Sequence, residues 1–202
     1  ESYKFNSSIQ EVENADAILL VGSNPRWEAS VLNARIRKAF IDNNCKVGLI
    51  GPALDLNYAY DKISESLDEL NNILDNKSKF SEVLFNAKNP IIIVGTSAIN
   101  TSEGTSVLKT CAEIAKKLPN FSKEFNPLNI LNQDISRVGS LELGFINKVF
   151  DGDIEKKLKE EIDLNKPVVF LLGLDEINLK SLDGSFVVYF GHHGDVNAQY
   201  AN

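Results

Sequence analysis

Residues 16–25 read Asp-Ala-Ile-Leu-Leu-Val-Gly-Ser-Asn-Pro, and this stretch decides the fold. The run of five apolar residues is typical of a strand that is buried on both faces. Gly22 permits a tight turn at the end of that strand, because glycine has no side chain to restrict the backbone. Ser23 or Asn24 can cap a following helix, and Pro25 suits its first turn. The stretch therefore predicts a strand, a tight turn and a helix, which open a βαβ unit.

The same alternation continues along the chain, where short apolar runs are separated by amphipathic segments. We expect strands at residues 17–22, 46–50, 90–95, 129–131, 168–173 and 186–191. We expect helices around residues 32–40, 61–75, 81–87, 107–118, 140–146 and 153–162. Near-continuous apolar strands separated by helices indicate a mainly parallel sheet with helices on both faces. The predicted fold class is therefore α/β, doubly wound, and we interpret residues 1–202 as one domain.

The composition argues against several classes of protein. The 202 residues include 28 acidic and 21 basic side chains, and this net charge of −7 argues against a general nucleic-acid or anionic-membrane binder. The longest apolar runs hold about six residues, far short of the roughly 20 that span a bilayer, so no direct membrane insertion is expected. Methionine is absent. We interpret the chain as a piece of a longer protein, truncated at both ends.

The loop of residues 22–25 is the first candidate binding site, because doubly wound sheets bind ligands beyond the carboxyl ends of their strands. Its backbone amides at a helix start can bind a phosphate. The same residues also make an ordinary strand-to-helix turn, and they do not form a GxGxxG fingerprint. A second loop, residues 96–104, offers further hydroxyls and amides. Glu28, Glu103 and the acidic pair at residues 175–176 bring negative charge to such loops, which disfavours a phosphate.

Histidines and cysteines give little indication of catalysis or metal binding. His192 and His193 are adjacent after an apolar strand, and neighbours on an extended backbone point to opposite sides, so they suit a bidentate metal site poorly. Because Asp195 is close by, a proton relay or metal site stays open beside the favoured structural role. Cys45 and Cys111 match no metal-ligand spacing and cannot supply the four ligands of an iron-sulfur cluster. Two reduced thiols are favoured, with a disulfide as the alternative.

A longer motif carries a resemblance to a known family. Residues 16–29 (Asp-Ala-Ile-Leu-Leu-Val-Gly-Ser-Asn-Pro-Arg-Trp-Glu-Ala) and 31–38 (Val-Leu-Asn-Ala-Arg-Ile-Arg-Lys) resemble the signature of the large iron-sulfur subunit of respiratory complex I, the NADH:quinone oxidoreductase. Further matches follow in the same order at residues 46–51, 55–58, 129–132, 169–173 and 191–196. The chain is therefore identified as a member of that family, from its region similar to molybdopterin oxidoreductases such as formate dehydrogenases.

The resemblance implies what the chain holds and what it lacks. In the wider superfamily the Gly-x-Asn-Pro turn belongs to a pterin guanine dinucleotide site, whereas the complex I branch keeps the region as fold, generally without molybdenum. Residues 22–25 are then a vestigial loop, and no catalytic, cofactor-binding or metal-binding residue is expected here. Clusters of the 4Fe-4S and 2Fe-2S types are expected in a missing N-terminal part of the subunit. Local departures from the family pattern are Ser30 for proline, Asn197 for glycine, and the acidic loop at Asp175 and Glu176.

The implied function is architectural: a non-redox portion that supports electron transfer from NADH to quinone by the whole complex. The implied partners are the rest of the same subunit and other subunits of the hydrophilic arm, on the cytoplasmic side of the bacterial inner membrane or the mitochondrial matrix side. Two alternatives stay open: an active molybdopterin guanine dinucleotide-binding oxidoreductase domain, and a nucleotide-binding domain of a thiamine-diphosphate enzyme. We also predict that a basic patch meets acidic groups of a partner; its members are Arg26, Arg35, Arg37 and Lys38.

Overall fold

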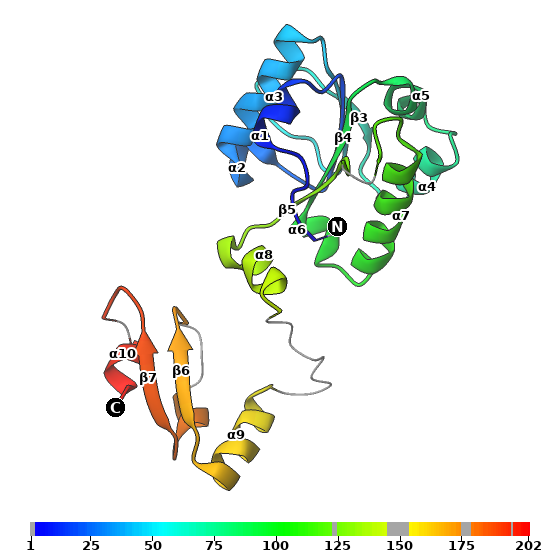
Figure 1. The fold of residues 1–202 in the computed structure, drawn as a ribbon. Helices are drawn as coiled ribbons and strands as arrows, with labels where there is room; N and C mark the ends of the chain where they lie inside the picture. Colours follow the sequence, from blue (N-terminus) through cyan, green and yellow to red (C-terminus); the bar gives the residue numbers. More distant parts are fainter. Residues whose placement is uncertain (1–2, 123–124, 145–153, 175–178, 195) are drawn as a thin grey trace. The chain divides into compact units, whose positions relative to one another are not determined.

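The computed structural model describes residues 3–122, 125–144, 154–174, 179–194 and 196–202 (Figure 1). The chain divides into two compact units, Glu1–Gly144 and Phe145–Asn202, and each is described by itself. The prediction of a single domain over residues 1–202 stays a prediction.

A five-stranded parallel sheet forms the centre of the first unit. Its strand order is β3-β2-β1-β4-β5, and each neighbouring pair is parallel. The strands are β1 (Ala17–Val21), β2 (Lys46–Ile50), β3 (Asp61–Ser64), β4 (Pro90–Gly95) and β5 (Leu128–Leu131). The side chains of β1 are completely buried, as its unbroken apolar run predicts.

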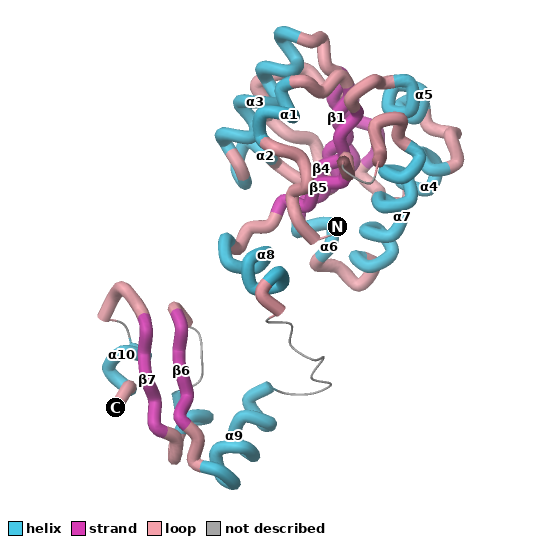
Figure 2. The backbone as a smooth tube through the Cα atoms, in the orientation of Figure 1, coloured by secondary structure: helices cyan, strands magenta, loops and turns pink. Residues whose placement is uncertain are grey.

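Helices cover the two faces of this sheet in separate groups (Figures 1 and 2). One face packs against α1 (Ile9–Glu13) and α3 (Ser30–Asp42). The opposite face packs against α4 (Glu69–Leu74), α5 (Lys79–Asn86) and α7 (Gly104–Lys117). The remaining helices of this unit are α2 (Pro25–Glu28), α6 (Thr96–Ile99) and α8 (Ile135–Glu142). The predicted doubly wound α/β class is confirmed.

The two buried cysteines lie in different halves of the core. Cys45 packs with Ile18 on the α3 side of the sheet, and Cys111 packs with Leu19 on the α7 side. Both are free thiols, so the disulfide alternative is wrong. Burial raises the pKa of each thiol to about 12, which keeps both protonated and unreactive near neutral pH.

Two local predictions in this unit are wrong, and one helix was missed. Residues 61–64 were expected to begin a helix but form β3, because the open edge of β2 offers backbone partners that an isolated helical pattern does not reveal. The helix expected at residues 140–146 is displaced to α8, and residues 145–146 lie outside the described chain. Helix α1 was not predicted, although Ser8 and Glu11 form a reciprocal capping box whose S-x-x-E spacing is visible in the sequence.

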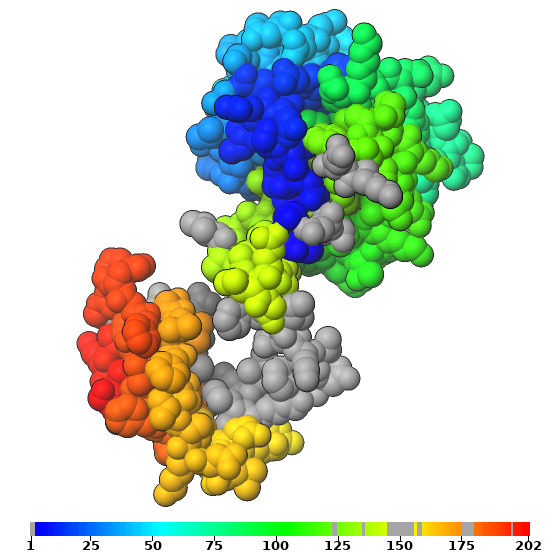
Figure 3. All heavy atoms as spheres, viewed as in Figure 1, coloured from blue at the N-terminus to red at the C-terminus, as the bar shows by residue number. Residues whose placement is uncertain are grey.

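The N-terminal segment pairs with β5 at the outer edge of the sheet, and its atoms lie on the surface of this unit (Figure 3, dark blue). The backbone amide of Ile130 in β5 donates to the carbonyl of Lys4 at 3.1 Å. The Ser7 amide donates to Oδ1 of Asn129 at 2.7 Å, and Nδ2 of Asn129 donates to the Ser7 hydroxyl at 3.0 Å. These bonds satisfy a fully buried asparagine and leave less of the β5 edge open for pairing with another chain.

The second unit contains a separate two-stranded parallel sheet of β6 (Val168–Leu172) and β7 (Phe186–Phe190). Its other elements are α9 (Ile154–Asn165), the 3₁₀-helix η1 (Leu179–Leu182) and α10 (Val196–Tyr200). Ile162, Leu171, Leu182 and Val187 form its small core. The expectation that these two strands extend the main sheet is therefore wrong, because each strand finds its partner in the other.

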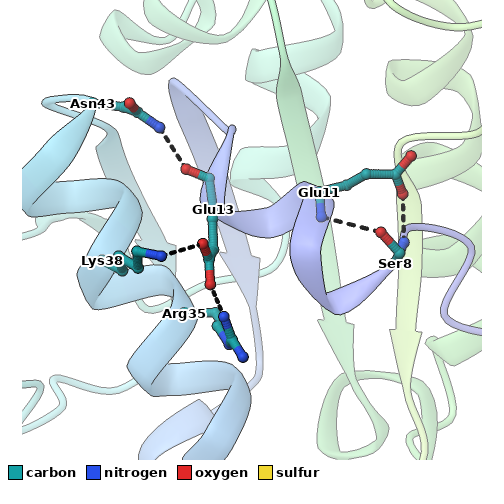
Figure 4. Close-up of polar contacts among 6 residues, drawn as sticks. All are labelled: Ser8, Glu11, Glu13, Arg35, Lys38 and Asn43. Atoms are coloured by element: carbon teal, nitrogen blue, oxygen red, sulfur yellow. Dashed lines mark hydrogen bonds and ion pairs between the residues drawn. The ribbon is translucent and has the colours of Figure 1, made fainter.

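A carboxylate on α1 ties that short helix to α3 (Figure 4). The Glu13 carboxylate accepts from Arg35 and, at 2.6 Å, from Nζ of Lys38, and its side chain is only 17% exposed. The Glu13 carbonyl accepts from the side chain of Asn43 at the end of α3. A carboxylate shared by two cations and shielded from water contributes more than an exposed surface pair.

The predicted basic patch is largely paired within the chain. Arg35 and Lys38 contact Glu13, and Arg26 pairs with Asp55 and donates to its carbonyl at 2.8 Å. Nε of Arg37 donates to the Asn57 carbonyl at 3.3 Å. That part of this patch meets acidic groups in the rest of the subunit or in a neighbour stays a prediction, and these internal oxygen atoms would compete for the same donors.

Replacing Glu13→Gln should lower the free energy of unfolding by about 1 kcal/mol, because two cations lose their shared carboxylate. Urea unfolding at low salt measures this, and the difference should shrink at about 1 M salt, where charges are screened. Asp42→Asn, which removes an exposed carboxylate from α3, is the matched control and should change stability by less than about 0.5 kcal/mol. Equal effects of the two substitutions would contradict the role given to Glu13.

Candidate functional site

The candidate site lies where β1 and β4 end side by side. The connection after β1 runs through α3 on one face of the sheet, whereas the connection after β4 runs through α7 on the other. Neighbouring connections that leave toward opposite faces create a switch point, which is the usual ligand site of a doubly wound sheet. The predicted loop of residues 22–25 lies at this point.

Two glycines allow the strand ends to approach each other closely. A Cβ on Gly95 would lie 2.2 Å from the carbonyl oxygen of Gly22, which no side chain tolerates. Gly22 itself has φ of +52°, and a Cβ there would lie 2.6 Å from the Cβ of Ala98. The Ser97 hydroxyl donates to the Gly22 carbonyl and joins the two loops. The switch point is consequently closed by backbone and one hydroxyl rather than held open.

The donors of the 22–25 loop are occupied by a carboxylate from the same chain. The backbone amide of Asn24 donates to Oε1 of Glu28 at 3.0 Å, and the Ser23 hydroxyl donates to Oε2 at 3.2 Å. Glu28 therefore sits where an anionic ligand of this loop would sit. The expected cap is also corrected: Asn24 is at the N-cap position of α2 but makes no side-chain capping bond, and its buried Oδ1 has no hydrogen-bond partner.

The space beside this loop is small. The cavity has a volume of about 100 Å³. Its lining is Gly22, Ser23, Asn24, Glu28, Leu49, Gly51, Pro52, Leu54 and Ser97. Sites for drug-sized ligands typically enclose about 300–1,000 Å³. A pterin guanine dinucleotide does not fit these residues, because the cavity is too small and a carboxylate repels its diphosphate.

The second candidate loop contributes little to this site. Residues 96–99 form α6, in which Ala98 lies against Gly22 and Ser97 donates a hydrogen bond to the first loop. Glu103 occupies the N-cap position of α7 and lines a different hollow, beside Leu70 and Asn71 of α4. Glu28 therefore brings its negative charge to the 22–25 loop, whereas Glu103 does not. The acidic pair at residues 175–176 lies outside the described residues.

The side chains of His192 and His193 are oriented differently from the prediction. The rings of His192 and His193 touch edge to face, with centroids 4.3 Å apart, so they do not point to opposite sides. The backbone bends after β7 ends at Phe190, which ends the alternation expected of a strand. Among the residues that the structure describes, no three His, Cys, Asp or Glu side chains are grouped as metal ligands. Asp195, named as the third member of that group, lies outside the described residues.

Comparison with protein families assigns the whole chain. The model of the molybdopterin oxidoreductase family matches residues 1–202. The chain belongs to the molybdopterin oxidoreductase family. Its parallel sheet and the turn after β1 agree with the resemblance that its sequence carries.

Curated relatives of this family member match it along its full length. It is 38% identical to the mitochondrial NADH-ubiquinone oxidoreductase 78 kDa subunit of Candida albicans, over 100% of this chain and 26% of the relative. It is 39% identical to the mitochondrial NADH dehydrogenase [ubiquinone] iron-sulfur protein 1 of Solanum tuberosum, over 99% and 26%. It is 33% identical to the NADH-ubiquinone oxidoreductase 75 kDa subunit of Reclinomonas americana, over 100% and 28%. The chain thus spans about a quarter of the length of these relatives.

Guanosine diphosphate at about 1 mM should leave the melting temperature of this chain unchanged within error, because Glu28 occupies the donors that a phosphate needs. Ligand stabilisation grows with the ratio of ligand concentration to dissociation constant, so thermal unfolding with and without the nucleotide measures the affinity directly. Glu28→Gln keeps the shape of the side chain, removes its charge and tests whether the carboxylate is the obstacle. A shift of several degrees in the unaltered chain that disappears in Asn24→Ala would contradict the closed site.

Proposed function

We propose that this chain is a structural, non-redox portion of the large iron-sulfur subunit of NADH:quinone oxidoreductase, complex I. In that role it supports electron transfer from NADH to quinone by the whole complex and performs no chemical step itself. The observation that carries the proposal is the internal carboxylate: the loop placed to hold an anionic cofactor has its donors bound to Glu28. The similarity to complex I subunits over the full chain supports the choice of complex.

The proposed partners are the rest of the same subunit and other subunits of the hydrophilic arm. The two-stranded sheet of the second unit supports this part of the proposal, because the described residues of this unit leave the face opposite its small core apolar and exposed. Its exposed residues are Val168, Phe170, Leu172, Phe186 and Phe190. Parallel sheets are normally covered on both faces. A covering segment from another part of the subunit or complex would remove this apolar surface from water.

The proposal places the redox centres outside this chain. The 4Fe-4S and 2Fe-2S clusters would belong to a region of the subunit that the chain does not span, and the chain would hold neighbouring elements in position. Two of the relatives are named as mitochondrial. None of the described helices has the length and apolar character needed to cross a bilayer. We propose a location in the peripheral arm, on the matrix side or the corresponding cytoplasmic side of a bacterial membrane.

The purified chain should be colourless and should contain far less than one atom of molybdenum, tungsten or iron per molecule. For iron this follows from the cysteines, which are buried in separate halves of the core and cannot share a cluster. For molybdenum and tungsten it follows from the 22–25 loop, whose small cavity and bound carboxylate do not fit the pterin cofactor that would carry the metal. Elemental analysis and visible absorption measure it, and a bacterially expressed molybdopterin enzyme carried through the same preparation controls for metal loss. Near-stoichiometric metal that survives gel filtration would favour an active molybdopterin enzyme instead.

Replacing Phe170→Ser and Phe190→Ser together should weaken incorporation of the subunit into complex I by at least tenfold. Each substitution removes about 1.5–3 kcal/mol of apolar burial if the face is covered in the complex, and 1.4 kcal/mol corresponds to a factor of ten. The measurement is the amount of subunit in the purified complex relative to its amount in the cell. Leu164→Ser, which changes an exposed apolar residue on α9, is the control. Normal incorporation of the double variant would contradict the proposed use of this face.

A further inference from the structure

A large apolar groove lies on the surface of the first unit. It encloses about 760 Å³, and residues from α1, α2, α3, β5 and α8 line it. Three of its apolar side chains are unusually exposed for their size: Trp27 at 84%, Val31 at 64% and Ile9 at 49%. Single exposed apolar residues are ordinary, but a groove that gathers three of them indicates an interaction surface.

Trp27 is held in place by the same contacts that close the switch point. Its amide donates to the Asn24 carbonyl at 3.0 Å, and the carboxylate of the next residue, Glu28, binds the Asn24 amide and the Ser23 hydroxyl. The short helix α2 is thereby fixed at both its start and its last residue. A tryptophan presented on a fixed backbone loses less freedom on binding than one on a loose loop, which favours affinity.

The charges around the groove define the chemistry of its occupant. The charged residues in its lining are Glu28 and Asp134, and the lining contains no lysine or arginine. Glu28 is already engaged by the loop, whereas Asp134 is exposed and makes no side-chain capping bond to α8. An occupant that places apolar side chains against Trp27 and a basic side chain against Asp134 would match both features.

We propose that this groove binds an apolar segment with a basic side chain, supplied by another part of the same polypeptide. The relatives extend well beyond the region that matches this chain, which spans about a quarter of their length, so a subunit of that length would have ample chain to supply such a segment. This source rests on the proposed function, in which the chain is one portion of the large subunit. A second copy of the chain and a different subunit are the competing occupants.

Oxidative footprinting of unaltered protein tests whether the groove is covered. Trp27 is the only tryptophan of the chain, so its oxidation is assigned without ambiguity by mass spectrometry. We expect hydroxyl radicals to oxidise Trp27 at least five times faster in the isolated chain than in the assembled complex. Phe121 is an exposed aromatic residue outside the groove and serves as the internal reference. Equal oxidation of Trp27 in both samples, relative to Phe121, would overturn the proposal.

A crosslink then identifies the occupant. A photoreactive p-benzoylphenylalanine in place of Val31 should form its main crosslink in the complex to the same subunit, outside the matched region and beside a lysine or arginine. Crosslinks to a second copy or to a different subunit would overturn the proposal. In an Asp134→Lys variant we expect the yield of this crosslink to fall at least fivefold. An unchanged yield would also overturn the proposal. Failure of the proposed function gives a different result: the unaltered chain would then be absent from purified complex I.

Discussion

The complete burial of β1 is the constraint on which the first unit depends. Its five residues have no exposed surface, and they alternate between two cores, with Ile18 and Leu20 facing α3 and Leu19 and Val21 facing α4, α5 and α7. A strand in this position must be apolar at every residue, and it must be paired on both edges, here by β2 and β4. The helices on each face are arranged around that strand. Truncation of one such leucine to alanine typically costs about 2–5 kcal/mol.

The switch point keeps the backbone geometry of a ligand site, but the residues around it leave little room for a ligand. The backbone arrangement at Gly22 and Gly95 still brings the two strand ends together at the expected place. A carboxylate four residues after Asn24 then binds the loop, and the remaining space is about 100 Å³. The same carboxylate fixes α2 and so sets the position of Trp27. One side chain therefore closes an internal site and helps to build an external surface.

The sequence predicted well what depends on local pattern. The apolar runs located β1, β2 and β4, and the amphipathic spacing located α3 and α7, because these elements bury continuous or periodic apolar surface. Prediction from the sequence failed where residues distant in the chain determine whether a segment forms a strand and which strand it pairs with. Residues 61–64 are a strand only because β2 has a free edge. The pairing of β6 with β7 cannot be inferred from the runs themselves.

The location of the candidate site was predicted, but the hydrogen bonds that fill it were not. The loop at residues 22–25 lies at the switch point as expected, since the order of strands and turns determines where such a point falls. Glu28 was recognised as a repelling charge, but its hydrogen bonds to the loop were not foreseen. Its spacing from Asn24, together with a proline at the first helical position, was the available signal. The rings of His192 and His193 were misplaced because a bend replaced the assumed extended backbone.

The hydrogen bonds between the N-terminal segment and β5 have a consequence for biosynthesis. Lys4 and Ser7 are made before their partners Asn129 and Ile130, which follow more than a hundred residues later. Domains generally fold as units during synthesis, and contacts between distant residues form slowly. The outer position of the nascent sheet therefore stays empty for most of the unit's translation. After β4 is made and before β5 follows, β4 presents an unpaired edge that chaperones are suited to shield from neighbouring nascent chains.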